Sequence, residues 1–115
     1  MSRTSEAAAM AEPLAVRTAP GDGRDVTLRL SGELDAHTSP LLEHHLEHAV
    51  AATDGDVRLE VSELTFVDSS GLGCLLRAAG TLGSLDRRLV LRAPSPPLQR
   101  LIELAGVAPH LAVES

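Results

Sequence analysis

Thr65-Phe66-Val67-Asp68-Ser69-Ser70-Gly71-Leu72-Gly73 is the stretch around which the chain is organised. Its first residues are β-branched or aromatic and are typical of a strand, whereas the serines and glycines that follow are typical of a tight turn. Asp68 or Ser69 can cap a following helix, because a side-chain oxygen accepts a hydrogen bond from a free backbone N–H. Ser70 would lie in the first turn of that helix, where unpaired N–H groups and the helix dipole favour a phosphate.

The residues after this turn have the period of a helix with two distinct faces. Apolar residues recur at i, i+3, i+4 and i+7 and predict one buried stripe: Leu72, Leu75, Leu76 and Ala79. A second set has the same spacing and is predicted to lie on the exposed side: Ser70, Gly73, Cys74 and Arg77. Ser70 is therefore expected to head an exposed face of small residues with one cation, against which a partner surface can pack closely.

The composition describes an acidic chain that is long enough for one domain. It has 115 residues and a net charge of -6, and Phe66 is its only aromatic residue. This charge argues against direct binding to nucleic acid or to anionic membranes. Cys74 is the only cysteine, which excludes an internal disulfide and a multi-cysteine metal site. Because no apolar run is long enough for a membrane span or typical of a signal peptide, we expect a cytoplasmic protein. The small exposed faces fit a monomer, and we expect neither a cofactor nor a metal.

Hydrophobic periodicity predicts strands that alternate with helices. Residues 1–12 are small and polar and are expected to be disordered, which leaves 13–115 as one domain. Strands are predicted at 13–18, 26–30, 57–67, 89–91 and 111–113, the first two forming a hairpin through a turn at 20–23. This order predicts an α/β fold with a single mixed, largely parallel sheet of four or five strands and helices packed against it.

The other two predicted helices span about 41–52 and 96–105. Thr38 or Ser39 is expected to cap the first of them, and Gly106 suits the C-terminal end of the second. The apolar side of the first helix is predicted to be buried: Leu41, Leu42, Leu46, Ala49 and Val50. The opposite side carries Glu43, His44, Glu47 and His48.

Several motifs allow a second interpretation. Asp68-Ser69-Ser70-Gly71 can be a helix cap and nothing more. His44-His45-Leu46-Glu47-His48 matches the H-x-x-E-H zinc signature and leaves open a metal-dependent hydrolase that uses His44 and His48. A solvated helix face is the favoured interpretation, because no later segment offers an obvious third ligand. A Ser70, His37 and Asp35 triad lacks the G-x-S-x-G elbow, and the sequence contains no phosphate-binding loop for a nucleotide.

Three segments together resemble the STAS domain of the bacterial anti-sigma factor antagonists. They are Leu30-Ser31-Gly32-Glu33-Leu34-Asp35-Ala36-His37-Thr38, the stretch 64–73, and Ser95-Pro96 with 98–106. The resemblance covers residues 14–113 and implies the STAS fold. Many members of that family add a final helix after the last strand, whereas this sequence ends at Ser115.

The resemblance also implies a phosphorylation switch at Ser70, supported by Asp68, Ser69 and Gly71. In that family the unphosphorylated antagonist binds an anti-sigma factor, which is a GHKL-type serine kinase, and frees a sigma factor. Phosphorylation blocks this binding, and a PP2C-type phosphatase reverses it, so the antagonist itself is not an enzyme. The expected partner-binding residues are Glu33, Asp35, His37, Thr38, Gly73, Cys74 and Arg77. STAS domains also serve as stressosome scaffold subunits and as accessory subunits of lipid-transport ABC systems.

Overall fold

The predicted alternation of strands and helices is present in the structure. This computed structural model describes residues 13–20 and 23–115, so the expected disorder of 1–12 and the centre of the predicted turn at 20–23 lie outside the described residues. The strands are β1 (Leu14–Pro20), β2 (Val26–Leu34), β3 (Val57–Val67), β4 (Leu89–Arg92) and β5 (Ala112–Glu114). The α-helices are α2 (Ser39–Ala52), α3 (Ser69–Gly83) and α4 (Pro96–Ala105), and a 3₁₀ helix, η1 (Ala108–His110), precedes β5.

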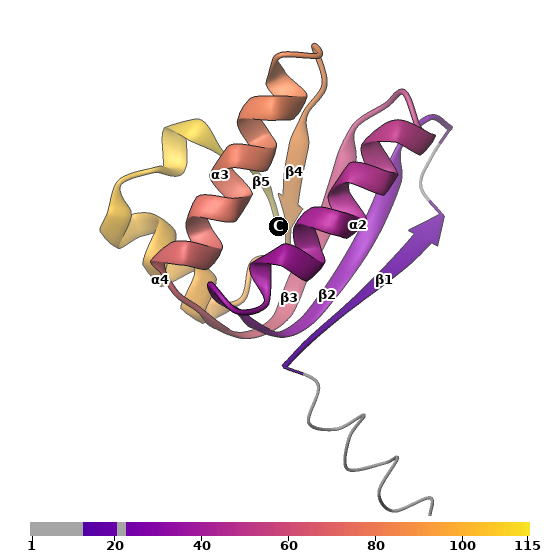
Figure 1. The fold of residues 1–115 in the computed structure, drawn as a ribbon. Coiled ribbons are helices and arrows are strands. Elements are labelled where there is room, and N and C mark those ends of the chain that lie inside the picture. The colour runs from indigo at the N-terminus through magenta and orange to yellow at the C-terminus, as the bar shows by residue number, and fades with distance from the viewer. Residues whose placement is uncertain (1–12, 21–22) are drawn as a thin grey trace, which may run out of the picture.

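The strands form one mixed sheet in the order β1-β2-β3-β4-β5. The β1–β2 pair is antiparallel, as the predicted hairpin requires, and the other three pairs are parallel. Because each crossover moves the chain in the same direction along the sheet, right-handed connections bring successive helices to the same face. Figure 1 shows α2 and α3 lying across one face of the sheet. The predicted fold class is therefore confirmed.

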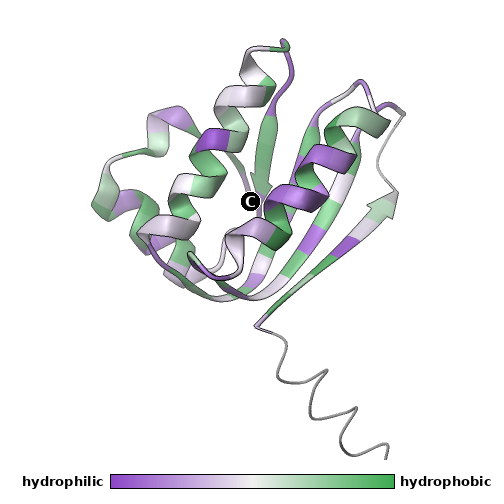
Figure 2. Ribbon diagram, in the orientation of Figure 1, coloured by the Kyte–Doolittle hydropathy of each residue, from purple (hydrophilic) through white to green (hydrophobic). Residues whose placement is uncertain are grey.

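Period-2 alternation separates a packed face of the sheet from a polar one. Figure 2 shows hydrophobic and hydrophilic bands alternating along β1 and β2. On β3, Val57, Leu59 and Val61 are fully buried in the core, whereas Arg58 and Glu60 point to the other face. There Arg58 forms ion pairs with Asp25 and Glu114, each at 3.3 Å. The helices therefore cover one face, and the opposite face is held together by charged side chains.

Helix α4 packs mainly against β3, and β4 pairs only with the first residues of that strand, Val57 to Glu60. The backbone N–H of Ser95 donates to the carbonyl of Val61 (3.2 Å), which fixes where α4 begins. Gly106 ends the helix in the left-handed conformation at φ 69°, as the sequence predicts, and its N–H donates to the carbonyl of Ile102 (3.1 Å). Within the described residues, none of the helices is both long and apolar enough to cross a membrane.

Two expectations about the start of α2 are wrong. Leu41 is exposed rather than buried, because the face of α2 that packs on the sheet is narrower than the apolar pattern suggested: it contains Leu42, Leu46 and Ala49. Thr38 is the N-terminal cap by position, but its side chain forms no cap hydrogen bond. The Thr38 hydroxyl is already engaged within the preceding loop.

Leu98 and Leu104 offer a matched test of packing within α4. Leu98 is 0% exposed, whereas Leu104 is 78% exposed. Leu98→Ala should lower the free energy of unfolding by about 2–5 kcal/mol, because it removes buried methyl groups and leaves a cavity. Leu104→Ala should change that free energy by less than about 0.5 kcal/mol. Urea unfolding followed by circular dichroism measures both values, and equal losses would contradict the described packing.

Candidate functional site

The site lies where the carboxyl ends of β2 and β3 meet. Leu34, the last residue of β2, pairs with Val67, the last residue of β3. The chain leaves β2 into the loop 35–38 and leaves β3 directly into α3. Because the two strands are parallel neighbours, this loop and the first turn of α3 lie side by side, at the edge of the sheet where α/β folds place their functional groups.

Gly71 allows the start of α3 to approach β2 closely. It is buried, and a Cβ at this position would overlap the carbonyl oxygen of Leu34 and lie 2.9 Å from Leu34 Cγ. The backbone N–H of Asp68 donates to the same carbonyl at 3.3 Å. Only a residue without a side chain fits between these backbones, so Gly71 fixes the distance between the helix and the strand.

Asp68 is the residue that caps α3. Its backbone is extended (φ -108°), and its Oδ1 accepts a hydrogen bond from the Gly71 N–H at 2.9 Å. Of the two caps that the sequence allows, the structure therefore has Asp68 and not Ser69. Ser69 and Ser70 are the first two helical residues, and both are exposed. The Ser70 hydroxyl thus belongs to the first turn, as predicted.

The loop 35–38 is held rigid by Asp35. Its Oδ1 accepts hydrogen bonds from the N–H groups of His37 (2.9 Å) and Thr38 (3.0 Å). The Thr38 hydroxyl accepts from the Asp35 N–H and donates to the Glu33 carbonyl, each at 2.9 Å. The N–H of Thr38 is the main cause that lowers the pKa of the Asp35 carboxyl, so the charged form that holds the turn is favoured.

These bonds divide the predicted partner-binding residues of the loop into two groups. Glu33 and His37 are exposed, and their side chains are accessible to a partner. Thr38 is 4% exposed and its hydroxyl is engaged within the loop, so its side chain is not accessible to a partner in this structure. Asp35 is partly buried and holds the turn.

Cys74 was expected on an exposed helix face, and this expectation is wrong. Its side chain is 1% exposed, because α2 packs beside α3 and covers that side of the helix. Burial is the main cause that raises the pKa of the Cys74 thiol, and the nearby carboxylate of Glu43 raises it further. Cys74 is therefore neither a docking residue nor an activated thiol. Gly73 is partly buried, and Arg77 remains exposed.

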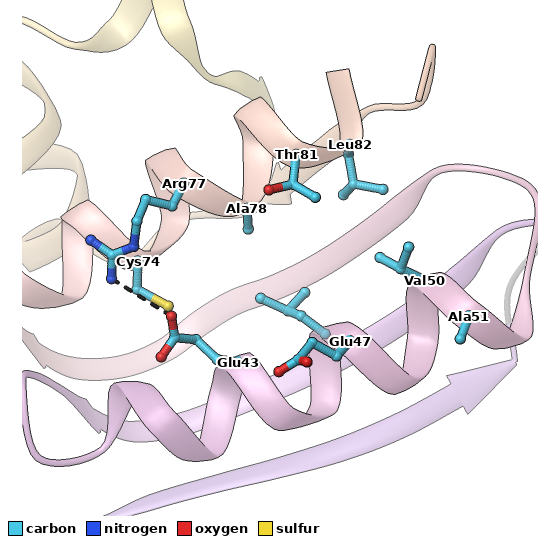
Figure 3. A pocket seen from close by; sticks show the side chains of 10 residues that line it. Glu43, Glu47, Val50, Ala51, Cys74, Arg77, Ala78, Thr81 and Leu82 are labelled. Carbon is cyan, nitrogen blue, oxygen red and sulfur yellow. Dashed lines mark ion pairs between the residues drawn. The ribbon is translucent and has the colours of Figure 1, made fainter. Parts of the chain in front are cut away.

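Two hollows lie along α2 and α3, and the smaller one adjoins Ser70. The first, of about 280 Å³, is lined by Ala36, Ser39, Pro40, Glu43, Ser70 and Arg77. The second, of about 450 Å³, runs between α2 and α3 (Figure 3). Glu43 and Arg77 line both hollows and form an ion pair of 3.7 Å between Arg77 Nη2 and Glu43 Oε2.

Glu43 is a site residue that sequence reasoning missed. The helical pattern assigned it to the solvated side of α2, but α2 and α3 both begin at the same edge of the sheet. Their first turns are therefore neighbours, and Glu43 faces the side of α3 that carries Arg77 (Figure 3). The predicted parallel order of the strands was a signal that could have identified Glu43, because parallel neighbouring strands place the helices that follow them side by side.

Comparison with known proteins decides the family. The family model described as "Mlab, STAS domain" matches residues 18–112. The chain belongs to the STAS domain family. Among curated relatives, an anti-sigma F factor antagonist of Paenibacillus polymyxa is 32% identical over 81 residues, which cover 70% of this chain and 69% of that protein.

Solved structures agree with this STAS assignment. The anti-sigma factor antagonist SpoIIAA in its unphosphorylated form is 25% identical, with a TM-score of 0.72 over 88% of this chain and 89% of that one. The Bacillus cell fate determinant SpoIIAA in its phosphorylated form is also 25% identical, with a TM-score of 0.67 over 88% and 92%. The predicted STAS fold is therefore confirmed.

In the described part of the chain, the structure does not assemble the two alternative sites that the sequence left open, which are a metal site at His44 and His48 and a catalytic triad at Ser70, His37 and Asp35. His44 and His48 are exposed on α2. Within residues 13–20 and 23–115, no group of three or more His, Cys, Asp or Glu side chains is placed to hold a metal ion. Asp35 Oδ1 accepts a hydrogen bond from the backbone N–H of His37. This bond shapes the turn and is not the contact between carboxylate and imidazole ring that a catalytic triad requires.

Gly71 and Gly80 offer a matched test of the close approach between the start of α3 and the end of β2. Gly71→Ala should lower the free energy of unfolding by about 1–3 kcal/mol, because its methyl group overlaps the Leu34 backbone. Gly80 lies in the same helix with open space around it, so Gly80→Ala should raise that free energy by roughly 0.5–1 kcal/mol. Thermal or urea unfolding measures both. A Gly71→Ala variant as stable as Gly80→Ala would show that position 71 has room for a side chain beside Leu34.

Proposed function

We propose that this STAS domain is an anti-sigma factor antagonist. Its unphosphorylated form binds an anti-sigma factor and so releases a sigma factor, and phosphorylation of Ser70 switches this binding off. The observation that carries the proposal is the position of Ser70. It is exposed in the first turn of α3, beside the rigid loop 35–38 and at the edge of a hollow. The relatives that match most of the chain carry the same functional name.

The physical basis of the switch is local charge and bulk. A phosphate adds about -1.5 to -2 charge. The free N–H groups at the start of α3 tolerate that charge in the isolated protein. A partner packed closely against Ser70 would meet a bulky ion, and any acidic group of that partner would be repelled. The switch therefore works without refolding of the STAS domain.

We propose that the partner surface lies around Ser70. The exposed side chains of Glu33 and His37 contribute from the β2–α2 region, and the exposed Arg77 contributes from α3 together with the partly buried backbone of Gly73. Asp35 and Thr38 act on this surface indirectly, because they fix the shape of the loop. Ser69 lies next to the modified residue, and Gly71 sets its position relative to β2.

The proposed partners follow from this role. The anti-sigma factor is a GHKL-type serine kinase that phosphorylates the antagonist, and a PP2C-type phosphatase restores it. The antagonist is a substrate and a ligand of that kinase and carries no catalytic centre of its own. It acts as a monomer in the cytoplasm, where bacterial transcription takes place.

Ser70 and its neighbour Ser69 provide the central test. Ser70→Ala should bind the anti-sigma factor and resist phosphorylation. Ser70→Glu should bind at least about tenfold more weakly, because a like-charge contact costs more than about 1.4 kcal/mol. Calorimetric titration against each GHKL-type serine kinase of the source organism, with and without ATP, measures both properties.

Ser69→Ala is the matched control for that test. It changes an equally exposed serine one position away and should keep both binding and phosphorylation. Loss of phosphorylation in Ser69→Ala, with Ser70→Ala still modified, would move the switch to Ser69. Binding of neither protein to any such kinase would overturn the proposed function.

Asp68 has a second role in this proposal. Its Oδ1 caps α3, and we infer that the carboxylate also orients the Ser70 hydroxyl or binds an ion during transfer. Asp68→Asn keeps the capping oxygen, since Asn caps helices about as well as Asp. The variant should fold normally and be phosphorylated at least about tenfold more slowly, because it lacks the charge. A kinase assay with radiolabelled ATP measures the rate of phosphorylation. An unchanged rate would show that the Asp68 carboxylate takes no part in the transfer.

A second candidate function keeps the fold and changes the partner. The matching family model includes Mlab in its description. STAS domains also act as accessory subunits of lipid-transport ABC systems and as scaffold subunits in stressosomes. A protein that copurifies with a transporter ATPase or a large scaffold, and never carries phosphate at Ser69 or Ser70, would favour these roles.

A further inference from the structure

The side chain of Arg77 lies along α3 in the direction of Ser70. Side chains on an α-helix lean toward its N-terminus, so Arg77 covers the turn that precedes it. That turn contains Gly73, and Arg77 Nη1 lies only 3.3 Å from the position that a Cβ of Gly73 would occupy. The absence of a side chain at position 73 therefore leaves a free path for the guanidinium along the helix surface.

The present partner of Arg77 is held weakly. The guanidinium pairs with Glu43 of α2, with Arg77 Nη2 and Glu43 Oε2 3.7 Å apart, as the dashed line in Figure 3 marks. The two side chains are 66% and 46% exposed, so water competes with the pair. Exposed ion pairs of this kind contribute little to stability. Arg77 can therefore exchange Glu43 for a stronger anion at small cost.

Ser70 and this guanidinium adjoin the same hollow. Ser70, Glu43 and Arg77 line the same hollow of about 280 Å³, which is large enough for a phosphate group. Seven residues separate Ser70 from Arg77, which corresponds to about 10.5 Å along the helix axis. The guanidinium already covers much of it, because Arg77 Nη1 lies beside position 73, which is only three residues, or about 4.5 Å along the axis, from Ser70.

We propose that a phosphate on Ser70 is bound within the same chain by the guanidinium of Arg77, which leaves Glu43 to do so. This inference rests on the proposed function only in taking Ser70 as the modified residue. A planar guanidinium can donate two parallel hydrogen bonds to the oxygens of a phosphate that carries up to two negative charges. Its present pair with Glu43 is a contact of 3.7 Å to a carboxylate with a single negative charge, so the phosphate is the stronger partner.

The exchange changes the site in two ways. It withdraws the exposed cation of α3 from the surface that faces a partner. It also leaves Glu43 without its cation at the end of the groove between α2 and α3, where Glu47 already lies (Figure 3). One modification at Ser70 therefore also leaves the Glu43 carboxylate uncompensated, so the change in charge distribution extends beyond Ser70.

Phosphorus NMR tests this contact without any kinase. Phosphoserine is incorporated at position 70 of the full chain during translation, and the second pKa of the phosphate, ordinarily about 6, is measured by titration. Arg77→Ala should raise this pKa by about half a unit, because a guanidinium favours the doubly charged phosphate. Glu43→Gln should lower it, because the competing carboxylate is gone. The shift in Arg77→Ala should shrink as salt is added.

Arg100→Ala is the matched control, since it removes an exposed arginine from α4, away from the hollow. His37 and Asp35 of the adjacent loop are present in every variant, so their charges cancel in the comparison. A phosphate pKa in Arg77→Ala equal to that in Arg100→Ala would overturn the inference, and so would an unchanged pKa in Glu43→Gln. If the predicted shifts occur but no host kinase modifies Ser70, the contact stands and the proposed function fails.

Discussion

The close approach of Gly71 to the Leu34 carbonyl is the contact on which the rest of the site depends. It brings the first turn of α3 against the end of β2, and the Asp68 N–H strengthens the join by donating to the same carbonyl. A larger residue would push the helix outward and move Ser70 away from the loop 35–38. The position of one serine hydroxyl is therefore set by backbone packing and does not depend on the serine's own contacts.

The site combines a rigid part with an adjustable part. The Asp35 turn uses the carboxylate, the Thr38 hydroxyl and backbone N–H groups in mutual hydrogen bonds, so the loop keeps one shape. The Arg77–Glu43 pair is exposed and long, so it can change partner without moving the backbone. The proposed binding surface can therefore respond to a new charge by rearranging side chains only, which suits the proposed phosphorylation switch.

The features that are local in sequence could be predicted, and those that depend on helix–helix packing could not. Period-2 patterns identified the strands, and Asp68 and Gly106 marked helix ends, because capping depends on a few adjacent residues. Cys74 was misplaced because the pattern of α3 does not reveal that α2 covers one of its sides. Glu43 was missed because its partner Arg77 belongs to a different helix, although the predicted parallel order of the strands already implied that the two helices begin side by side.

The most direct test of a phosphorylation switch at Ser70 is phosphosite mapping by mass spectrometry. The protein is purified from its own organism under several growth conditions, with a Ser70→Ala strain as the reference. We expect a phosphate on Ser70 whose occupancy changes with conditions and which is absent from the reference strain. A protein that is never phosphorylated at Ser70 under any of these conditions would contradict it.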